Sequence, residues 1–260
     1  MIYEFAPKAK TEKHTWICDG DTFTTDDGNY VEIRWDRDCD SPREDDNLGT
    51  FYTWLNSYES PDEAPDLEDL FDEYDLWDEW EKVEGANPIN WFAAKLNELG
   101  HVALPVAAYI HSGVAYKVGT PSQFPDSQWD AGYAGVIFVE ADKVCGDDWC
   151  SNIHEINRET RKLINRYLAD EVEYYNEWAQ GHCYGYVMYD REGTEIDSCW
   201  GFIGDDAETS GITDYMGGLT ETSLTLDDWV ELNADELDEW VELDADELDG
   251  TAASNDDYAA

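Results

Sequence analysis

Basic residues are scarce in this sequence. Its 260 residues include 15 Lys and Arg against 62 Asp and Glu, and the formal net charge is −47. Binding to nucleic acid through its phosphates requires a basic surface, so we expect no ordinary nucleic-acid binding. Segments 59–81 and 227–249 each hold 12 carboxylates and no basic residue, but the rest of the chain still has 38 acidic residues against 15 basic ones. The acidity is therefore global.

Long apolar runs are also missing. The longest, 102–110, has nine residues and is interrupted by Pro105, and the N-terminal sequence MIYEFAPKAK contains no apolar segment. We therefore expect neither a signal peptide nor a membrane span. Six cysteines are too few for a disulfide scaffold in a chain of this length. Reduced thiols and a cytoplasmic location are the expectation.

Acidic and aromatic side chains are present in excess. Hydrophobic residues make up 42% of the chain and aromatic residues 14%, which favours a packed core over disorder. In dilute buffer the net charge would destabilise the compact state, whereas at molar ionic strength the Debye length falls to about 3 Å and the repulsion is screened. The composition predicts a halophilic protein of the haloarchaeal type. The alternative is an acidic mesophilic protein with a solvating tail, which would be fully stable in dilute buffer.

Helices and strands are both indicated by the pattern. Apolar residues at helical spacing predict an amphipathic acidic helix over 66–82, a helix that begins after Asn87 with Pro88 and ends before Gly100, and a long helix over 157–179. Strands are predicted at 29–36, 101–111 and 134–140, and a β-hairpin turns at 191–193. Because these elements show no regular βαβ alternation, we predict an α+β fold with a mixed or antiparallel sheet and flanking helices.

The organisation that we predict is one α+β core domain over 1–211, with 59–82 as an acidic helical insertion, and an acidic helical tail over 212–260. The tail contains an eleven-residue repeat at 226–247, LDDWVELNADE followed by LDEWVELDADE. Eleven residues correspond to about 3.67 per helical turn, so the apolar side chains form one stripe along 226–248. This stripe either docks on the body of the protein or binds a host or viral protein.

Three ordered stretches carry a family resemblance. They are Asp40-Ser41-Pro42-Arg43-Glu44 with Asp46-Asn47-Leu48-Gly49-Thr50; His111-Ser112-Gly113 with Trp129-Asp130 and Gly132; and Glu195-Ile196-Asp197-Ser198-Cys199-Trp200-Gly201-Phe202. Together they resemble a family of small uncharacterised proteins of tailed phages and mobile elements, whose first loop reads SPREWDNLGT. Asp45 replaces the family's Trp, and Ala131 replaces a Ser that is usual in its WDSG motif. The resemblance spans roughly 30–205 and excludes both 59–82 and the repeat.

The candidate site consists of polar residues in four places that are predicted to be turns. His111, Asp130 and Asp197 are the candidate catalytic residues, with His111 as a base. The binding candidates are Arg43, Glu44, Asp46, Asn47, Ser112, Trp129, Cys199 and Trp200. If the loops meet at one end of a sheet, Arg43 would bind an anion and the aromatic residues would form walls. The alternative is that each loop is a tight turn whose side chains satisfy local backbone groups.

Other chemistry is less well supported by the spacing. Ser112 follows His111 directly and no GxSxG motif exists, so nucleophilic catalysis by Ser112, or by Cys199 beside His111, is a minor alternative. Cys145, Cys150 and His154, with His182 and Cys183, lack the usual zinc knuckle, and free thiols are the expectation. We expect no cofactor, although carboxylates at Asp38, Asp40, Glu44 and Asp46 offer hard-cation ligands without EF-hand spacing.

Three functional hypotheses remain open. The leading one is an accessory protein of a haloarchaeal virus or plasmid that binds a protein or a small ligand. The second is a small enzyme that uses the loop cluster of His, Asp and Arg. The third is an acidic anti-restriction or defence inhibitor that resembles DNA, an idea that acidity alone does not support because salt screens such mimicry.

Overall fold

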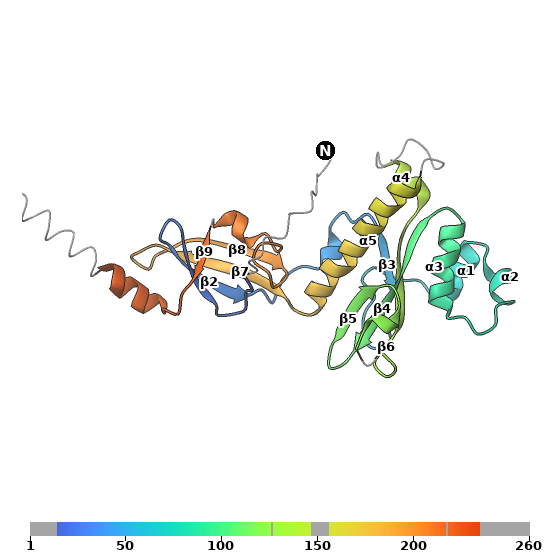
Figure 1. Cartoon of the computed structure of the whole chain (residues 1–260), viewed down its shortest axis with the longest axis horizontal. Helices are drawn as coiled ribbons and strands as arrows, with labels where there is room; N and C mark the ends of the chain where they lie inside the picture. The colour runs from blue at the N-terminus through green and yellow to red at the C-terminus, as the bar shows by residue number, and fades with distance from the viewer. Residues whose placement is uncertain (1–14, 126, 147–155, 217, 235–260) are drawn as a thin grey trace, which may run out of the picture. The chain divides into compact units, whose positions relative to one another are not determined.

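The fold contains two antiparallel sheets in two compact units. The computed structural model describes residues 15–125, 127–146, 156–216 and 218–234. Unit 1 comprises 1–39 and 183–260, and unit 2 comprises 40–182 (Figure 1). The predicted α+β class is confirmed. The division differs from the single core that we predicted over 1–211, because unit 2 is inserted between the two segments of unit 1.

Unit 1 is built on a five-stranded sheet of order β8-β7-β2-β1-β9. Its strands are β1 (Thr22–Thr25), β2 (Tyr30–Trp35), β7 (Cys183–Tyr189), β8 (Glu195–Ile203) and β9 (Leu219–Glu221). The β7 and β8 strands form the predicted hairpin, and Gly193 in its turn has φ +77°, a conformation that a residue without Cβ adopts without strain. Because β9 pairs with β1, residues beyond 211 belong to this sheet.

One face of this sheet forms the core of unit 1. Val31 and Ile33 of β2 alternate with residues on the opposite face, and they pack with Tyr186 of β7 and Phe202 of β8. The 3-10 helix Ile212–Tyr215 adds the fully buried Ile212 to the same cluster. This packing explains why the segment after 211 is part of the unit rather than a separate tail.

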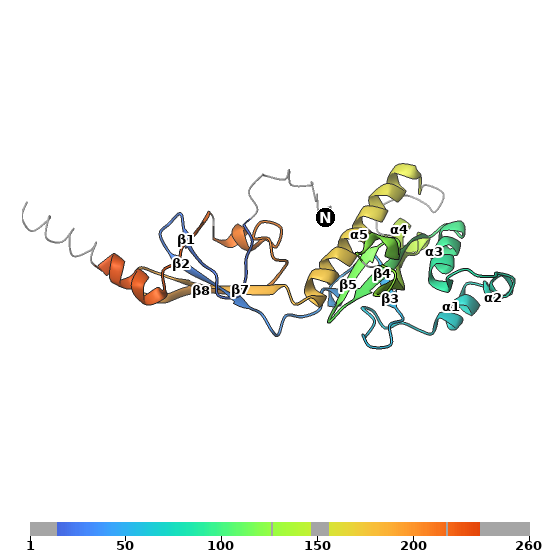
Figure 2. The same ribbon diagram turned by 60° about the horizontal axis from the view of Figure 1, so that its bottom comes forward.

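Unit 2 has three layers around a four-stranded sheet of order β3-β6-β4-β5 (Figures 1 and 2). Its strands are β3 (Thr50–Thr53), β4 (Val102–Ile110), β5 (Val114–Val118) and β6 (Ala131–Val139). Helix α5 (Arg158–Ala179) covers one face, and α1 (Leu67–Glu73), α2 (Trp77–Trp80) and α3 (Pro88–Glu98) cover the other; α4 (Ala141–Gly146) follows β6. Residues 134–139 of the central strand β6 are all buried, because helices cover both faces of the sheet there.

Two of the predicted helices in unit 2 have the expected ends. Asn87 accepts a hydrogen bond from the amide of Asn90, Pro88 is the first residue of α3, and Gly100 beyond its end has φ +103°. Asn157 caps α5 by accepting from two amides of its first turn. Each N-cap satisfies helix N–H groups that have no partner within the helix.

The single helix predicted over 66–82 is wrong, since the structure has α1 and α2 with a break between them. Asp75 adopts a left-handed conformation with φ +55°, and the amide of Leu76 donates to the carbonyl of Phe71 at 2.7 Å. This geometry is a Schellman motif, which ends α1 and turns Leu76 into the core. Among the helices in the described parts of the chain, none is both long enough and apolar enough to cross a membrane.

Candidate functional site

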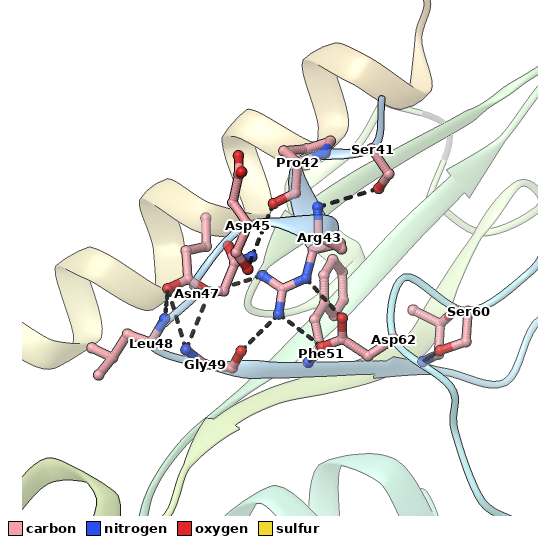
Figure 3. A network of polar contacts seen from close by, with 12 residues as sticks. Ser41, Pro42, Arg43, Asp45, Asn47, Leu48, Gly49, Phe51, Ser60 and Asp62 are labelled. Carbon is pink, nitrogen blue, oxygen red and sulfur yellow. Dashed lines mark hydrogen bonds and ion pairs between the residues drawn. The ribbon is translucent and has the colours of Figure 1, made fainter. Parts of the chain in front are cut away.

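The Arg43 guanidinium lies inside unit 2, where its side chain is only 5% exposed (Figure 3). It donates two hydrogen bonds to the carboxylate of Asp62, at 3.0 and 2.7 Å, and one to Glu171 of α5 at 2.9 Å. It donates another to the carbonyl of Gly49 at 2.6 Å. Burial alone would lower the pKa of Arg43, but the hydrogen bonds and charges of Asp62 and Glu171 raise it above its ordinary value.

The two carboxylates have further partners in the same loop. Glu171 accepts hydrogen bonds from the amides of Leu48 and Gly49, and Asp62 accepts one from the amide of Phe51. The structure gives no support to an external anion at Arg43, because Nε, Nη1 and Nη2 each donate to acceptors of the protein. We call Arg43, Asp62 and Glu171 the Arg43 network; it joins the 41–49 loop to α5 and to the 59–62 segment.

The rest of this loop is a turn whose backbone carbonyls accept hydrogen bonds from a side chain of the same loop. Asn47 donates to the carbonyls of Pro42 and Asp45, while Glu44 and Asp46 are exposed. Within the described chain, Asp38, Asp40, Glu44 and Asp46 supply no group of three ligand atoms within 4.8 Å of one another. The structure thus gives no support to the proposed Ca or Mg ligands in this loop.

A second group of the predicted residues meets at the end of β4 and the start of β6. His111 Nδ1 lies 3.2 Å from Asp130 Oδ2, and the amide of Ile110 donates to the carbonyl of Asp130 at 2.8 Å. Trp129, beside Asp130, is 85% exposed, more than any other large hydrophobic residue in the described chain. The pairing of β4 with β6 therefore brings His111 and Asp130 together, with Trp129 next to Asp130 in the chain.

Aromatic rings extend this group. The ring of Tyr109 stacks with that of His111, with centroids 6.0 Å apart and an interplanar angle of 19°, and with that of Phe124, at 5.7 Å and 21°. We call Tyr109, His111, Phe124, Trp129 and Asp130 the sheet tip. Tyr109 and Phe124 were not among the predicted site residues; the stacking of their rings places them with His111.

Ser112 forms the turn of the β4–β5 hairpin. Its φ is +59°, a left-handed conformation that is strained for a residue with a side chain, and its hydroxyl donates to the carbonyl of His111 at 2.6 Å. The hydroxyl thus satisfies a local backbone group, which is the structural role that we considered for these loops.

The remaining candidates lie on β8 in unit 1. Asp197 accepts a hydrogen bond from the hydroxyl of Tyr186 at 2.6 Å, and burial together with this carboxylate raises the pKa of Tyr186. Trp200 covers Gly185 of β7, where an added Cβ would clash with the indole, and Cys199 pairs with Tyr186. Each unit has its own part of the predicted set, so neither unit brings all four clusters together.

The cysteine and histidine ligand set is described only in part. The side chains of Cys145, Cys150 and His154 lie outside the described residues. His182 Nδ1 lies 2.6 Å from a carboxylate oxygen of Glu177, and Cys183 is a free, buried thiol. Burial raises the pKa of the Cys183 thiol to about 12.

Comparisons with known proteins give no further assignment. No family model, curated protein or solved structure matches the chain.

Proposed function

We propose that the protein acts by binding a protein or a small ligand, and that the sheet tip is its recognition surface. The observation that carries this proposal is the 85% exposure of Trp129 beside the His111 and Asp130 pair. A large aromatic side chain gains little for folding when it remains in water, whereas tryptophan is enriched among the residues that dominate binding energy. A binding role accounts for the exposure of Trp129.

The tip is also preorganised. The hydrogen bonds of β4 with β6 hold both segments, and the ring of Tyr109 stacks with those of His111 and Phe124. Rings fixed in this way lose little conformational freedom when a ligand covers them. Asp130 and His111 add polar groups that can orient a ligand beside the aromatic surface.

An enzymatic role has weaker support. His111 and Asp130 have the geometry of an oriented base, but Arg43 is closed within its network and Asp197 belongs to unit 1. Since Arg43 lies in its own network and the Ser112 hydroxyl is bound to the carbonyl of His111, the pair is better suited to recognition than to catalysis.

The proposed setting is the molar-salt cytoplasm of a haloarchaeal host, where the chain would be an accessory protein of a virus or plasmid. The net charge of −47 supports the salt environment, and the three ordered motifs support the mobile-element origin. Stacking and apolar contacts suit this setting because molar salt does not screen them, whereas attraction between exposed charges is screened within about 3 Å.

The experiment is a comparison of wild type, Trp129→Ala and Trp16→Ala in molar KCl. Trp16 is 61% exposed and lies in unit 1, so its replacement is a control for loss of an exposed indole. Each protein is used to capture partners from haloarchaeal lysate, and small-ligand binding is followed by tryptophan fluorescence. We expect a partner or ligand that binds wild type and Trp16→Ala but binds Trp129→Ala about 30-fold more weakly, as for a central interface residue. Equal binding to all three would contradict the proposal.

A further inference from the structure

The first copy of the tail repeat docks on the sheet of unit 1. Residues 226–234 are helical, and in Figure 1 this orange helix follows β9. The ring of Trp229 lies 6.1 Å from that of Tyr30 on β2, and the Tyr30 hydroxyl donates to the carbonyl of Leu224 at 2.9 Å. Val230 lies over Gly193, where an added Cβ would come within 2.7 Å of it. We call the surface made by Tyr30 and Gly193 the tail cradle.

The second copy of the repeat carries the same docking residues. Residues 237–247 are identical to 226–236 at nine of eleven positions, and Trp240 and Val241 correspond to Trp229 and Val230. A helix formed by either copy therefore presents the same tryptophan and valine at the same spacing. One cradle thus has two candidate ligands in a single chain.

The two positions that differ favour docking of the first copy. Asn233 is only 6% exposed and donates to the carbonyl of Trp229 at 2.7 Å, whereas the second copy has Asp244 at this position. A buried carboxylate that faces a carbonyl is unfavourable, since it cannot donate unless it is protonated.

The other difference lies at the start of the helix. Asp228 accepts from the hydroxyl of Thr225 at 2.7 Å, and its own amide donates to that hydroxyl at 3.2 Å. This reciprocal pair caps the first copy, while the second has Glu236 and Glu239 at the equivalent positions. Both differences favour binding of the first copy to the cradle. The second copy still has the tryptophan and valine that would pack against the cradle.

We propose that the tail cradle is a binding site for an acidic amphipathic helix of the sequence LDxWVEL, and that residues 237–247 are its second ligand. The second copy occupies the cradle when the first is released. Thr222 is hydrogen-bonded to Thr22, which fixes where the tail leaves the sheet. The second copy starts eleven residues later than the first, and the entropy of closing a loop rises only slowly with its length, so the cradle remains within its reach.

Trp229 supplies a reason why exchange is accessible. Its Nε1 is buried and has no hydrogen-bond partner within the described residues. An unsatisfied buried donor weakens the hold of the first copy. The proposal does not depend on the sheet tip, because the cradle and both copies of the repeat belong to unit 1.

The test is hydrogen exchange of the full-length chain in molar KCl, with peptides that resolve 226–234 from 237–247. Trp229→Ala should lower protection of the first copy and raise protection of the second by about 10-fold or more over wild type, as expected when a docked segment exchanges by local opening. Trp240→Ala is the matched control and should leave protection of the first copy unchanged. The double variant should protect neither. Equal protection of 237–247 in Trp229→Ala and in the double variant would overturn the proposal.

Trp229→Ala could unfold unit 1, and this would be detected as faster hydrogen exchange in β2 and β7. A milder pair of substitutions tests the proposal in that event. Asn233→Asp with Asp244→Asn exchanges the buried-position residues of the two copies and retains both tryptophans. We expect protection to shift from 226–234 toward 237–247. The proposal that 237–247 binds the cradle would be refuted if 226–234 stayed protected and the amides of 237–247 exchanged as fast as they do in Trp240→Ala.

Discussion

Replacing Arg43 by alanine should destabilise unit 2 strongly, because the substitution leaves two carboxylates in a largely buried site without their cation. Removal of one partner of a buried ion pair costs about 3–5 kcal/mol. Asp62 and Glu171 are 23% and 15% exposed, so water reaches them in part and the loss should lie near the lower limit. A loss of about 3 kcal/mol corresponds to a Tm lower by roughly 6–12 °C for a chain of this size.

The assay is thermal and denaturant unfolding in molar KCl, together with hydrogen exchange of the Leu48 and Gly49 amides, which both donate to Glu171. The exchange measurement locates the loss at the Arg43 network even if the two units unfold separately. Arg43→Lys should recover only part of the stability, because an ammonium group cannot reproduce the two parallel bonds to Asp62.

Lys162→Ala is the matched control, since its partner Glu159 forms an exposed pair on α5 with side chains that are 59% and 79% exposed. Its loss should be about 0–0.5 kcal/mol. The reasoning would be refuted if Arg43→Ala cost less than about 1 kcal/mol, or if Arg43→Lys were as stable as wild type.

Three further predictions concern packing, pH and salt. Gly49→Ala should lose about 1–3 kcal/mol in denaturant unfolding, because the added Cβ would lie 2.5 Å from Leu168 and 2.9 Å from Ile137; an unchanged midpoint would contradict the close packing. Burial raises the pKa of the Cys183 thiol from about 8.5 in the unfolded chain to about 12 in the folded protein. The free energy of unfolding of wild type should therefore fall as pH rises between these two values. Cys183→Ala lacks this thiol and should lose less stability over the same pH range. Wild type should gain stability as KCl rises to molar concentration because its charges are screened, and full stability in dilute buffer would count against the halophilic interpretation.

Much of the secondary structure was predictable because its signals are local. The Asn87, Pro88 and Gly100 pattern places α3 correctly, and the apolar spacing of 157–179 matches the buried face of α5. The predicted helix over 66–82 failed where the periodicity continued through a residue that adopts a left-handed turn, Asp75. The strand at 114–118 was not among the predicted strands, because it is short and has a glycine just beyond each end.

The candidate site was predicted only in part. His111 and Asp130 were candidates from separate loops, and strand pairing brings these two side chains together. The partners of Arg43 were not predicted, because Asp62 and Glu171 lie 19 and 128 residues away along the chain. No spacing rule connects such distant residues.

By itself, the sequence determined the acidic character, the α+β class, the ends of the long helices and the repeat of the tail, since these depend on composition and on neighbours within a few residues. Tertiary structure alone decided that unit 2 is inserted into unit 1, that Arg43 is a structural cation, and that the first copy of the repeat docks on Tyr30. These features depend on contacts between segments that are far apart in the chain, and such contacts form only where whole sheets and helices pack.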